Sequence, residues 1–397
     1  MKILQICNKP PLPPVDGGCI AMNAITEGLL EEKHSVRVFS IATDKHPFLP
    51  EQIDKTYLKE TEFESIYIDT SIKIPEAFMN LFSKESYNIK RFYSPLFEKK
   101  LVEILKKETF DIIHLESLYI TPYLATIRKY SNAKIILRAH NVEHEIWSRL
   151  AENTNHPLKS LYLGLLSKRL ESYESQMINK VDGIAAITDV DAMHFKEMGA
   201  EIPIVSIPLS IKTKESIPTG NEADPLSIFY LGSFDWLPNR EGIKWFLNKI
   251  WPHLSEHHPG LKLYIAGRNM PPAMKKIDLK NVEITGEVEN AADFMLSKSV
   301  MIVPLLSGSG IRVKIIEAMS LGKTIISTDT GAEGINYTDG ENILIANTPL
   351  EFAKGITKCL EDTDFALHLG NNAKELVKSY YSREMVTEKL VKFYTEI

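Results

Sequence analysis

Cysteine is scarce in this chain of 397 residues, which contains only Cys7, Cys19 and Cys359. They form neither a Cys-x-x-Cys pair nor a cluster with histidine, which argues against a disulfide scaffold and a structural zinc site. No apolar run approaches the roughly 18–20 residues that span a bilayer. Positive charge is not in excess, because 46 Lys and Arg stand against 52 Asp and Glu, a net charge of −6. Nucleic acid is therefore not expected as a partner, since its binding needs a basic face.

The first residues, MKILQIC, meet Asn8, Lys9 and Pro10 too early to form the apolar core of a signal peptide. We interpret this run as a buried first strand and expect a cytoplasmic protein. No Gly-x-Gly-x-x-Gly motif follows the run, which argues against a nicotinamide-dependent dehydrogenase.

Short β-branched runs alternate with longer helical patterns, which predicts an α/β protein. The predicted strands of the first half are 2–7, 35–42, 65–68, 111–116, 134–139, 183–188 and 202–207. A polar, aperiodic stretch follows, and then strands are predicted at 226–232, 261–267, 281–286, 300–306, 323–328 and 342–346. Several are almost wholly apolar, as parallel strands buried on both faces are. We predict two doubly wound, Rossmann-like domains at 1–207 and 227–380, joined by a linker at 208–226. Because such domains bind ligands at the carboxyl ends of their strands, two facing domains would form a site in the cleft between them.

The loop after the first strand contains four prolines and then Gly17 and Gly18, where a helix is predicted to begin. Two glycines let backbone N–H groups at a helix N-terminus approach an anion closely. A plain strand-to-helix turn is the alternative interpretation.

A second candidate, His140, stands at the carboxyl end of a predicted buried strand and is followed by Asn141. A histidine there can titrate near neutrality or donate to an oxyanion, and a purely structural histidine is the alternative. The run from His140 through Glu143 to His144 has the letters of an inverted zinc-protease motif, but no third ligand is evident, and no metal ion is predicted. His114 also ends a predicted strand.

The strongest pattern lies at 303–335, where a strand leads through a Gly/Ser-rich turn into a helix predicted at 312–321. Arg312 and Lys314 stand in its first turn, where each cation opposes the helix dipole by about 0.3–1 kcal/mol, so a bound diphosphate would account for them. Glu317 is expected to be buried among apolar neighbours and to need ligand hydroxyls as donors. A surface network of ion pairs among these three residues is the alternative.

The segment GSGIRVKIIEAMSLGKTIISTDTGAEGI at 308–335 resembles the donor site of retaining, nucleotide-sugar-dependent glycosyltransferases of family 4, also called glycosyl transferases group 1. The two-domain layout and the restart of strands near 226 are similar to that family as well. The resemblance implies the GT-B fold, with two Rossmann-like domains facing an inter-domain cleft. It implies no cofactor, because the nucleoside-diphosphate sugar is a substrate.

The resemblance also implies roles for residues of the second half. Glu317 would be the second glutamate of an E-x7-E motif and hold the donor ribose. The chain has Ser309 in place of the first glutamate, so Ser309 and the N–H groups of Gly310 and Ile311 are expected to contact the donor sugar. Arg240 only roughly replaces a lysine that binds the diphosphate in relatives, and Ser233 stands in place of their arginine. We therefore infer that Arg312 and Lys314 supply the missing positive charge. The nucleobase pocket is implied at Gly267, Arg268 and Val288.

In the first half, the resemblance implies that His140 contacts the transferred sugar. Gly17 and Gly18 would approach the diphosphate and the acceptor. The last segment, 381–397, is expected to form a helix that crosses back to the first domain.

Residues 73–107 carry eight Lys and Arg against four Glu, with aromatic residues interleaved. Two interpretations stay open: a surface that meets anionic membrane or a lipid-linked acceptor at the inner face of the membrane, or solvated helix faces over core aromatics.

These observations lead to the hypothesis of a glycosyltransferase that moves a sugar from a nucleoside diphosphate to a glycan or lipid-linked acceptor with retention, in synthesis of surface polysaccharide such as lipopolysaccharide. Two alternatives stay open. One is a GT-B sugar-nucleotide 2-epimerase, and the other is a non-catalytic subunit that binds a sugar nucleotide.

Overall fold

The computed structural model describes residues 1–80, 83, 85–154, 156–212, 224–308 and 311–397. Contacts between residues divide the chain into two compact units. Unit 1 comprises Met1–Ser210 together with Val386–Ile397, and unit 2 comprises Ile211–Met385. Most of the predicted linker, at 213–223, lies outside the described residues, and a strand already begins at Asp224.

Unit 1 contains a parallel sheet of seven strands in the order β3-β2-β1-β4-β5-β6-β7. Each strand predicted between residues 2 and 207 is present, with ends that differ by at most two residues. The strands are β1 (Lys2–Cys7), β2 (Ser35–Ala42), β3 (Glu64–Tyr67), β4 (Ile112–Glu116), β5 (Lys134–Ala139), β6 (Gly183–Ala186) and β7 (Ile204–Ser206).

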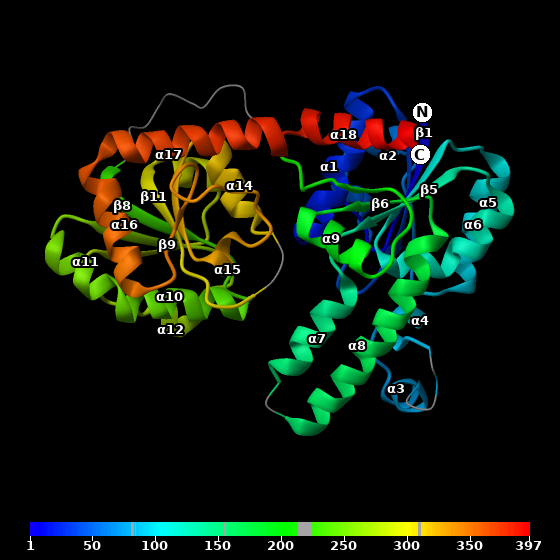
Figure 1. The fold of residues 1–397 in the computed structure, drawn as a ribbon, viewed down its shortest axis with the longest axis horizontal. Coiled ribbons are helices and arrows are strands. Elements are labelled where there is room, and N and C mark those ends of the chain that lie inside the picture. The colour runs from blue at the N-terminus through cyan, green and yellow to red at the C-terminus, as the bar shows by residue number, and fades with distance from the viewer. Residues whose placement is uncertain (81–82, 84, 155, 213–223, 309–310) are drawn as a thin grey trace. The chain divides into compact units, whose positions relative to one another are not determined.

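Helices cover both faces of this sheet (Figure 1). On one face, Leu4 and Ile113 share a buried cluster with Phe97 of α5, and on the other Ile3 shares one with Leu390 of α18. The helices are α1 (Gly17–Glu31), α2 (Lys55–Glu60), α3 (Ile74–Asn80), α4 (Tyr87–Lys90), α5 (Pro95–Lys107), α6 (Leu124–Tyr130), α7 (Glu143–Glu152), α8 (Pro157–Met177), α9 (Asp189–Glu197) and α18 (Arg383–Glu396), with short turns η1 (Pro50–Gln52), η2 (Leu118–Tyr123) and η3 (Ile178–Lys180).

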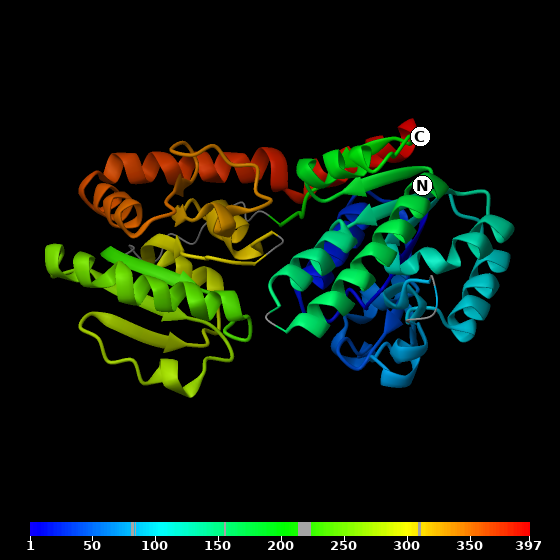
Figure 2. The ribbon, with the colours of Figure 1, turned by 60° about the horizontal axis from the view of Figure 1, so that its bottom comes forward.

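The helices α7 and α8 run side by side as a hairpin (Figures 1 and 2). The sequence did not predict α7, because its first turn consists of the polar residues after β5. Glu174 of α8 is buried, and its carboxylate accepts hydrogen bonds from the backbone N–H groups of Glu143, at 3.1 Å, and His144, at 3.2 Å. It thus satisfies two of the amides that the first turn of a helix leaves open, so α8 caps the start of α7.

The aromatic residues in 73–107 belong largely to the core. Tyr87 and Phe97 are buried, and Phe92 packs against the same cluster as Phe97. Lys73 and Lys90 form ion pairs with acidic neighbours. Outside the described parts of this segment lie Phe82, Lys84 and the side chain of Phe78. The described part favours solvated helix faces over core aromatics.

Unit 2 contains a parallel sheet of six strands in the order β10-β9-β8-β11-β12-β13. All strands predicted in the second half are present, with ends that differ by at most three residues. The strands are β8 (Asp224–Leu231), β9 (Lys262–Ala266), β10 (Val282–Gly286), β11 (Lys298–Val303), β12 (Thr324–Ser327) and β13 (Leu344–Ile345). The helices are α10 (Leu237–Lys249), α11 (Trp251–His257), α12 (Pro272–Lys275), α13 (Ala291–Leu296), α14 (Val313–Ser320), α15 (Asp329–Ala332), α16 (Pro349–Glu361), α17 (Thr363–Leu376) and the π-helical turn η4 (Val377–Tyr381).

The order of strands reverses between β1 and β4 in unit 1 and between β8 and β11 in unit 2. Ligands of open α/β sheets bind outside the carboxyl ends of the strands at such switch points. The loops after these four strands are therefore the places to look for a site. No helix in the described part of the chain combines the length and the apolar composition needed to cross a membrane.

Candidate functional site

The loop after β1 carries an ion pair at the switch point of unit 1, and His46, after β2, joins it. Nζ of Lys9 lies 2.7 and 2.8 Å from the two carboxylate oxygens of Asp16, and Nε2 of His46 lies 2.9 Å from Oδ2. Asp16 also caps α1, since Oδ1 accepts the N–H of Cys19 at 3.1 Å. Burial raises the pKa of Asp16, but Lys9, His46 and this amide outweigh burial, and the pKa lies well below its usual value. The ionised carboxylate therefore holds the Lys9 ammonium beside the start of α1.

Gly17 and Gly18 are the first residues of α1, close to the predicted start. A Cβ atom on Gly18 would lie 2.7 Å from Nζ of Lys9. A side chain at this position would displace the ammonium from Asp16, so glycine at position 18 serves the packing of the loop. The approach of an anion to these amides stays a prediction.

Asp16, Cys19 and His46 are the one group of three or more potential metal ligands within the described ranges, with ligand atoms within 4.8 Å of one another. Lys9 already neutralises the Asp16 carboxylate, and a metal ion would have to displace its ammonium. Burial raises the pKa of the Cys19 thiol, which disfavours the thiolate that a metal needs. These residues fit an internal salt bridge better than a metal ion.

His140 follows β5 directly and is partly exposed, as predicted for a side chain at a strand end. Its Nε2 atom lies 2.8 Å from Oε2 of Glu116, the last residue of β4, which is fully buried. Burial lowers the pKa of His140, and the Glu116 carboxylate offsets only part of this effect. Because a carboxylate only accepts hydrogen bonds, neutral His140 carries its proton on Nε2 and presents Nδ1 as an acceptor. This geometry suits the binding of a hydroxyl group.

A second buried carboxyl group lies three residues after His140. Glu143, the first residue of α7, accepts a hydrogen bond from the hydroxyl of Tyr119 at 2.9 Å. Burial raises the pKa of Glu143 to about 7, and the neighbouring Glu174 carboxylate contributes to this shift. A carboxyl group that titrates near neutrality can accept or donate a proton at physiological pH. The half-buried Asn141 lies on the same loop.

At the switch point of unit 2, the chain passes from β11 through Gly308 towards α14, which begins at Val313. Arg312 is the N-cap residue of α14, and its guanidinium lies over the indole of Trp236, with Cζ 4.7 Å from the ring centroid. Gly308 has a φ of +121°, and a Cβ there would lie 2.6 Å from Trp236. Glycine is thus required where the loop passes Trp236. The guanidinium of Arg312 also donates from Nη2 to the carbonyl oxygen of Thr330 at 3.4 Å, so the indole of Trp236 is one of the groups that hold Arg312 at the helix N-terminus.

Lys314 lies in the first turn of α14, and its Nζ is 2.6 Å from Oε2 of Glu317. The prediction that Glu317 is buried is wrong, because 32% of its side chain is exposed. The helical period of 3.6 residues turns Ile315, Ile316 and Met319 inward and leaves 314 and 317 on the outer side. Of the ion-pair network considered from the sequence, the Lys314–Glu317 pair is present.

The remaining residues predicted to contact the nucleotide-sugar donor stand before α14 in the sequence, on α10, and after β9 and β10. Ser309 and Gly310 lie outside the described residues. Ile311 is half-buried beside the start of α14, and Arg240 is half-buried in the first turn of α10. After β9, Arg268 is exposed, and after β10, Val288 is half-buried.

Gly267 follows β9 with a φ of +153°, and a Cβ there would lie 1.7 Å from the carbonyl oxygen of Gly232. The loops after β8 and β9 approach each other so closely that only glycine fits. The structure therefore explains Gly267 by backbone packing, and contact with a nucleobase stays a prediction.

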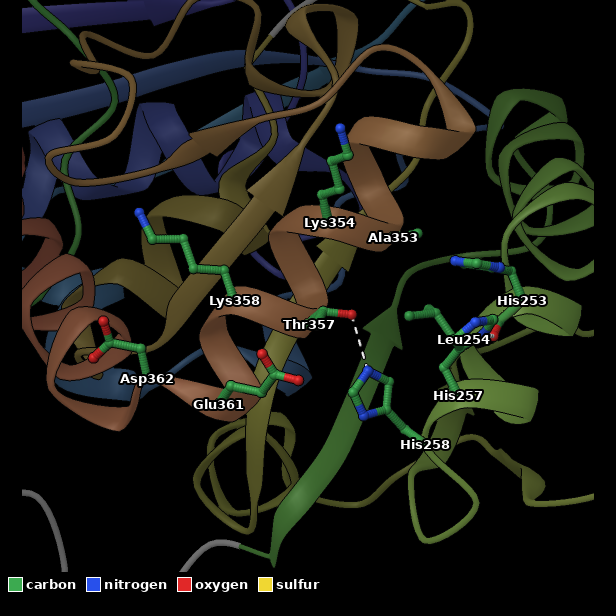
Figure 3. A pocket seen from close by; sticks show the side chains of 10 residues that line it. All are labelled: His253, Leu254, His257, His258, Ala353, Lys354, Thr357, Lys358, Glu361 and Asp362. Carbon is green, nitrogen blue, oxygen red and sulfur yellow. Dashed lines mark hydrogen bonds between the residues drawn. The ribbon is translucent and has the colours of Figure 1, made fainter.

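Unit 2 also contains a cavity of about 590 Å³ between α11 and α16 (Figure 3). Inside it, Nε2 of His258 lies 2.9 Å from Oγ1 of Thr357. The cavity lies near the start of β9, which begins at Lys262, only four residues after His258. Ligand sites of such sheets lie at the opposite, carboxyl ends of the strands. This cavity is thus separate from the candidate site.

Sequence reasoning missed the partner of His140. Glu116 belongs to the strand run IIHLE, and a carboxylate in an otherwise apolar strand cannot be buried without hydrogen-bond partners. The carboxylate in this apolar strand was therefore the sign in the sequence that Glu116 has a hydrogen-bond partner. Lys9 and Trp236 were missed as well, because a single cation or aromatic residue in a loop carries no periodic pattern.

The fold places this chain in a class. Two parallel, Rossmann-like units with helices on both sides of each sheet are the components of the GT-B fold, and solved GT-B structures are similar along the whole chain. Sucrose-phosphate synthase of Thermosynechococcus elongatus has a TM-score of 0.70 at 17% identity and covers 100% of this chain and 99% of its own. HepE of Anabaena, solved in complex with UDP, has a TM-score of 0.68 at 12% identity and covers 100% of both chains.

The family is given by sequence. A family model described as Glycosyltransferase Family 4 matches residues 17–215, and a model described as Glycosyl transferases group 1 matches residues 225–362. The chain belongs to the glycosyltransferases. An uncharacterized 44.6 kDa protein in the cps region of Klebsiella pneumoniae is 24% identical over 401 residues, 98% of this chain and 99% of that protein.

Proposed function

We propose that this chain transfers a hexosyl group from a nucleoside-diphosphate sugar to a glycan or lipid-linked acceptor, with retention of the anomeric configuration. The observation that carries this proposal is the position of Arg312 and Lys314 at the N-terminal end of α14, next to the switch point of unit 2. Each cation there costs about 0.3–1 kcal/mol against the helix dipole, and a bound diphosphate reverses that cost.

Two findings on similar proteins support the proposal. HepE was solved with UDP, which supports a nucleoside diphosphate as the donor group. The relative from Klebsiella pneumoniae is encoded in a cps region, which supports a role in the synthesis of surface polysaccharide. A cytoplasmic location and contact with an anionic membrane through 73–107 stay predictions from the sequence.

On unit 2, the proposed chemistry is electrostatic. Negative charge grows on the diphosphate as it leaves the sugar, and donors already aimed at that charge stabilise the transition state. Trp236 helps to hold Arg312 in place before the donor binds. Lys314 exchanges its partner Glu317 for the diphosphate, and the released Glu317 carboxylate accepts hydrogen bonds from the ribose hydroxyls.

The other donor contacts keep the roles that the family resemblance implies. Arg240 adds positive charge near the diphosphate, Ser309, Gly310 and Ile311 contact the sugar, and backbone groups at Gly267, Arg268 and Val288 hold the base. Neither a metal ion nor a cofactor takes part in this proposal.

On unit 1, His140 receives a hydroxyl of the transferred sugar at Nδ1, the nitrogen that does not face Glu116. Asn141 lies on the same loop and adds a second polar contact. The amides of Gly17 and Gly18 approach the diphosphate and the acceptor.

Lys314→Ala tests the proposal. Because a charge-assisted hydrogen bond to phosphate is worth roughly 1.5–3 kcal/mol, kcat/KM should fall by about 10-fold to 150-fold. The melting temperature should change little, since exposed ion pairs contribute about 0–1 kcal/mol. The assay measures transfer from a panel of labelled nucleotide sugars, and NMR of the product reports the anomeric configuration.

Lys354→Ala is the matched control, because Lys354 is an exposed lysine in the cavity between α11 and α16. Unchanged turnover in Lys314→Ala would contradict the proposal. Incubation of donor without acceptor separates the alternatives: interconversion of two sugar nucleotides would identify an epimerase, and binding without transfer or hydrolysis would identify a binding subunit.

A further inference from the structure

A row of polar side chains crosses the centre of the sheet in unit 1. Gln5 of β1 pairs with His114 of β4, and Glu116 of β4 pairs with Arg138 of β5. All four residues are fully buried. They lie an even number of residues along their strands from Ile3, Ile112 and Ile136, so they share with these the face covered by α1 and α18. Polar groups inside an apolar layer are costly to bury unless they are hydrogen-bonded, so the contacts of this row are worth following one by one. Within the described residues, Nε2 of His114 and the three guanidinium nitrogens of Arg138 make no hydrogen bond.

These contacts form a chain from the last helix to the candidate site. The hydroxyl of Tyr394, near the end of α18, is hydrogen-bonded to Nδ1 of His114. Nε2 of His114 lies 3.3 Å from Oε1 of Glu116, and Oε2 of Glu116 lies 2.8 Å from Nε2 of His140. His114 does not end its strand, as the sequence suggested, but lies buried in the middle of β4. We refer to these four residues as the Tyr394–His140 chain. It lies wholly within unit 1.

The position of the proton on each imidazole of the Tyr394–His140 chain follows from what its neighbours can donate or accept. A carboxylate has no proton to donate, so His140 donates from Nε2 to Glu116. Nε2 of His114 lies 3.3 Å from Oε1 without a well-directed hydrogen bond, but a lone pair there would face the carboxylate, so the proton of His114 also lies on Nε2. Both Nδ1 atoms are then acceptors. The Tyr394 hydroxyl fills the Nδ1 position of His114. Nδ1 of His140 has no hydrogen bond to any residue in the described part of the chain.

Other side chains keep the Glu116 carboxylate ionised and fixed in orientation. Nε2 of Gln5 donates to Oε1 at 2.8 Å, and Thr26 of α1 donates to the amide oxygen of Gln5 at 2.6 Å. Nε of Arg138 lies 3.8 Å from Oε2. Burial raises the pKa of Glu116, but His114, His140 and Arg138 outweigh burial, and the pKa lies well below its usual value.

We propose that Tyr394 is a positioning residue for His140. Docking of α18 supplies the hydroxyl that holds His114 in its Nε2–H tautomer. His114 and Gln5 then orient the Glu116 carboxylate, which holds His140 with its proton on Nε2 and its Nδ1 lone pair open at the strand end. Only the identity of the group that meets Nδ1, a sugar hydroxyl, rests on the proposed function.

Loss of the Tyr394 hydroxyl leaves Nδ1 of His114 buried without a donor. The Nε2–H tautomer of His114 then loses the donor that favours it over the Nδ1–H tautomer. A shift to the other tautomer, or a turned ring, removes the N–H group from the face of Glu116. The carboxylate then loses one of the contacts that set its plane, and the Nε2–H tautomer of His140 is no longer favoured.

The test is 15N NMR of protein labelled in histidine, without substrate, with the His140 signals assigned from their loss in His140→Gln. The wild type should show a protonated Nε2 and an unprotonated Nδ1. In Tyr394→Phe, the ratio of the His140 tautomers should shift by about fivefold, the effect of one ordinary net hydrogen bond. Tyr123→Phe is the matched control, since Tyr123 is also buried in unit 1 but its hydroxyl donates a hydrogen bond to the backbone carbonyl oxygen of Phe92.

Glu116→Gln serves as the second variant should Tyr394→Phe fail to fold. Its amide can turn an NH2 group towards either ring, so it should also shift the His140 tautomers. An unchanged His140 spectrum in a folded Tyr394→Phe or Glu116→Gln protein would overturn the proposal. Equal shifts in Tyr394→Phe and Tyr123→Phe would overturn it too, because they would indicate general loosening. The spectra need no sugar transfer, so failure of the proposed function leaves this result independent.

Discussion

Replacing Glu143 by glutamine should make unit 1 more stable, and the gain should grow with pH. Glu143 is buried at the start of α7, and burial raises its pKa from 4.5 to about 7. Below pH 4.5 the carboxyl is protonated in the folded and unfolded chains alike. Between pH 4.5 and 7 the unfolded chain releases its proton first, so stability of the wild type falls as pH rises. Above pH 7 the wild type has lost this contribution to its unfolding free energy completely, and its stability no longer changes with the ionisation of Glu143.

The size of the gain follows from the shift. A difference of about 2.5 pKa units corresponds to about 3 kcal/mol, at 1.36 kcal/mol for each unit. The glutamine side chain has a similar volume, and its amide oxygen can accept the hydrogen bond from Tyr119. Because glutamine does not titrate, the difference in unfolding free energy between variant and wild type should rise by about 3 kcal/mol from pH 4 to pH 8.

Urea unfolding at several pH values measures this difference. Trp147 of α7 is the one tryptophan of unit 1, so its resonance in protein labelled with 5-fluorotryptophan reports this unit alone. Glu145→Gln is the matched control, because Glu145 lies on the same helix with its carboxylate partly exposed and paired with Arg149. A difference between Glu143→Gln and wild type that stays flat from pH 4.5 to 8 would refute the reasoning.

Two further predictions concern unit 2. Gly267→Ala should destabilise this unit by more than about 3 kcal/mol, because its Cβ would lie 1.7 Å from a carbonyl oxygen at a φ of +153°. Gly286→Ala, at a φ of +76° with open space around it, should cost about 1–2 kcal/mol, and equal melting temperatures of the two variants would contradict this prediction. Trp236→Leu should loosen Arg312 by removing the stacking contact and raise the dissociation constant for UDP by about 2-fold to 30-fold, measured by calorimetry. Unchanged UDP affinity would show that the stacking does not prepare Arg312 for the diphosphate.

The architecture was largely predictable because it depends on local patterns. Buried parallel strands are apolar on both faces, so runs such as KILQIC and KIILRA stand out from amphipathic helices. The helix α7 was missed because its start has no N-cap side chain of its own and is capped by Glu174 from α8. A contact between residues 31 positions apart leaves no local signal.

The candidate site was predictable in its positions and not in its contacts. His140, Arg312 and Lys314 were found because strand ends and helix starts can be read along the chain. The exposure of Glu317 was misjudged, because the apolar neighbours in sequence lie around the helix rather than around one side chain.

The sequence by itself determined the alternation of strands and helices and the loops in which reactive side chains stand, since these depend on periods of two and 3.6 residues. The tertiary structure alone decided which of those side chains share protons and charge. Tyr394 reaches His114 across 280 residues, and Glu116 reaches His140 because β4 and β5 are neighbours in the sheet. Such contacts depend on the order of strands and the docking of α18, and long-range packing sets both.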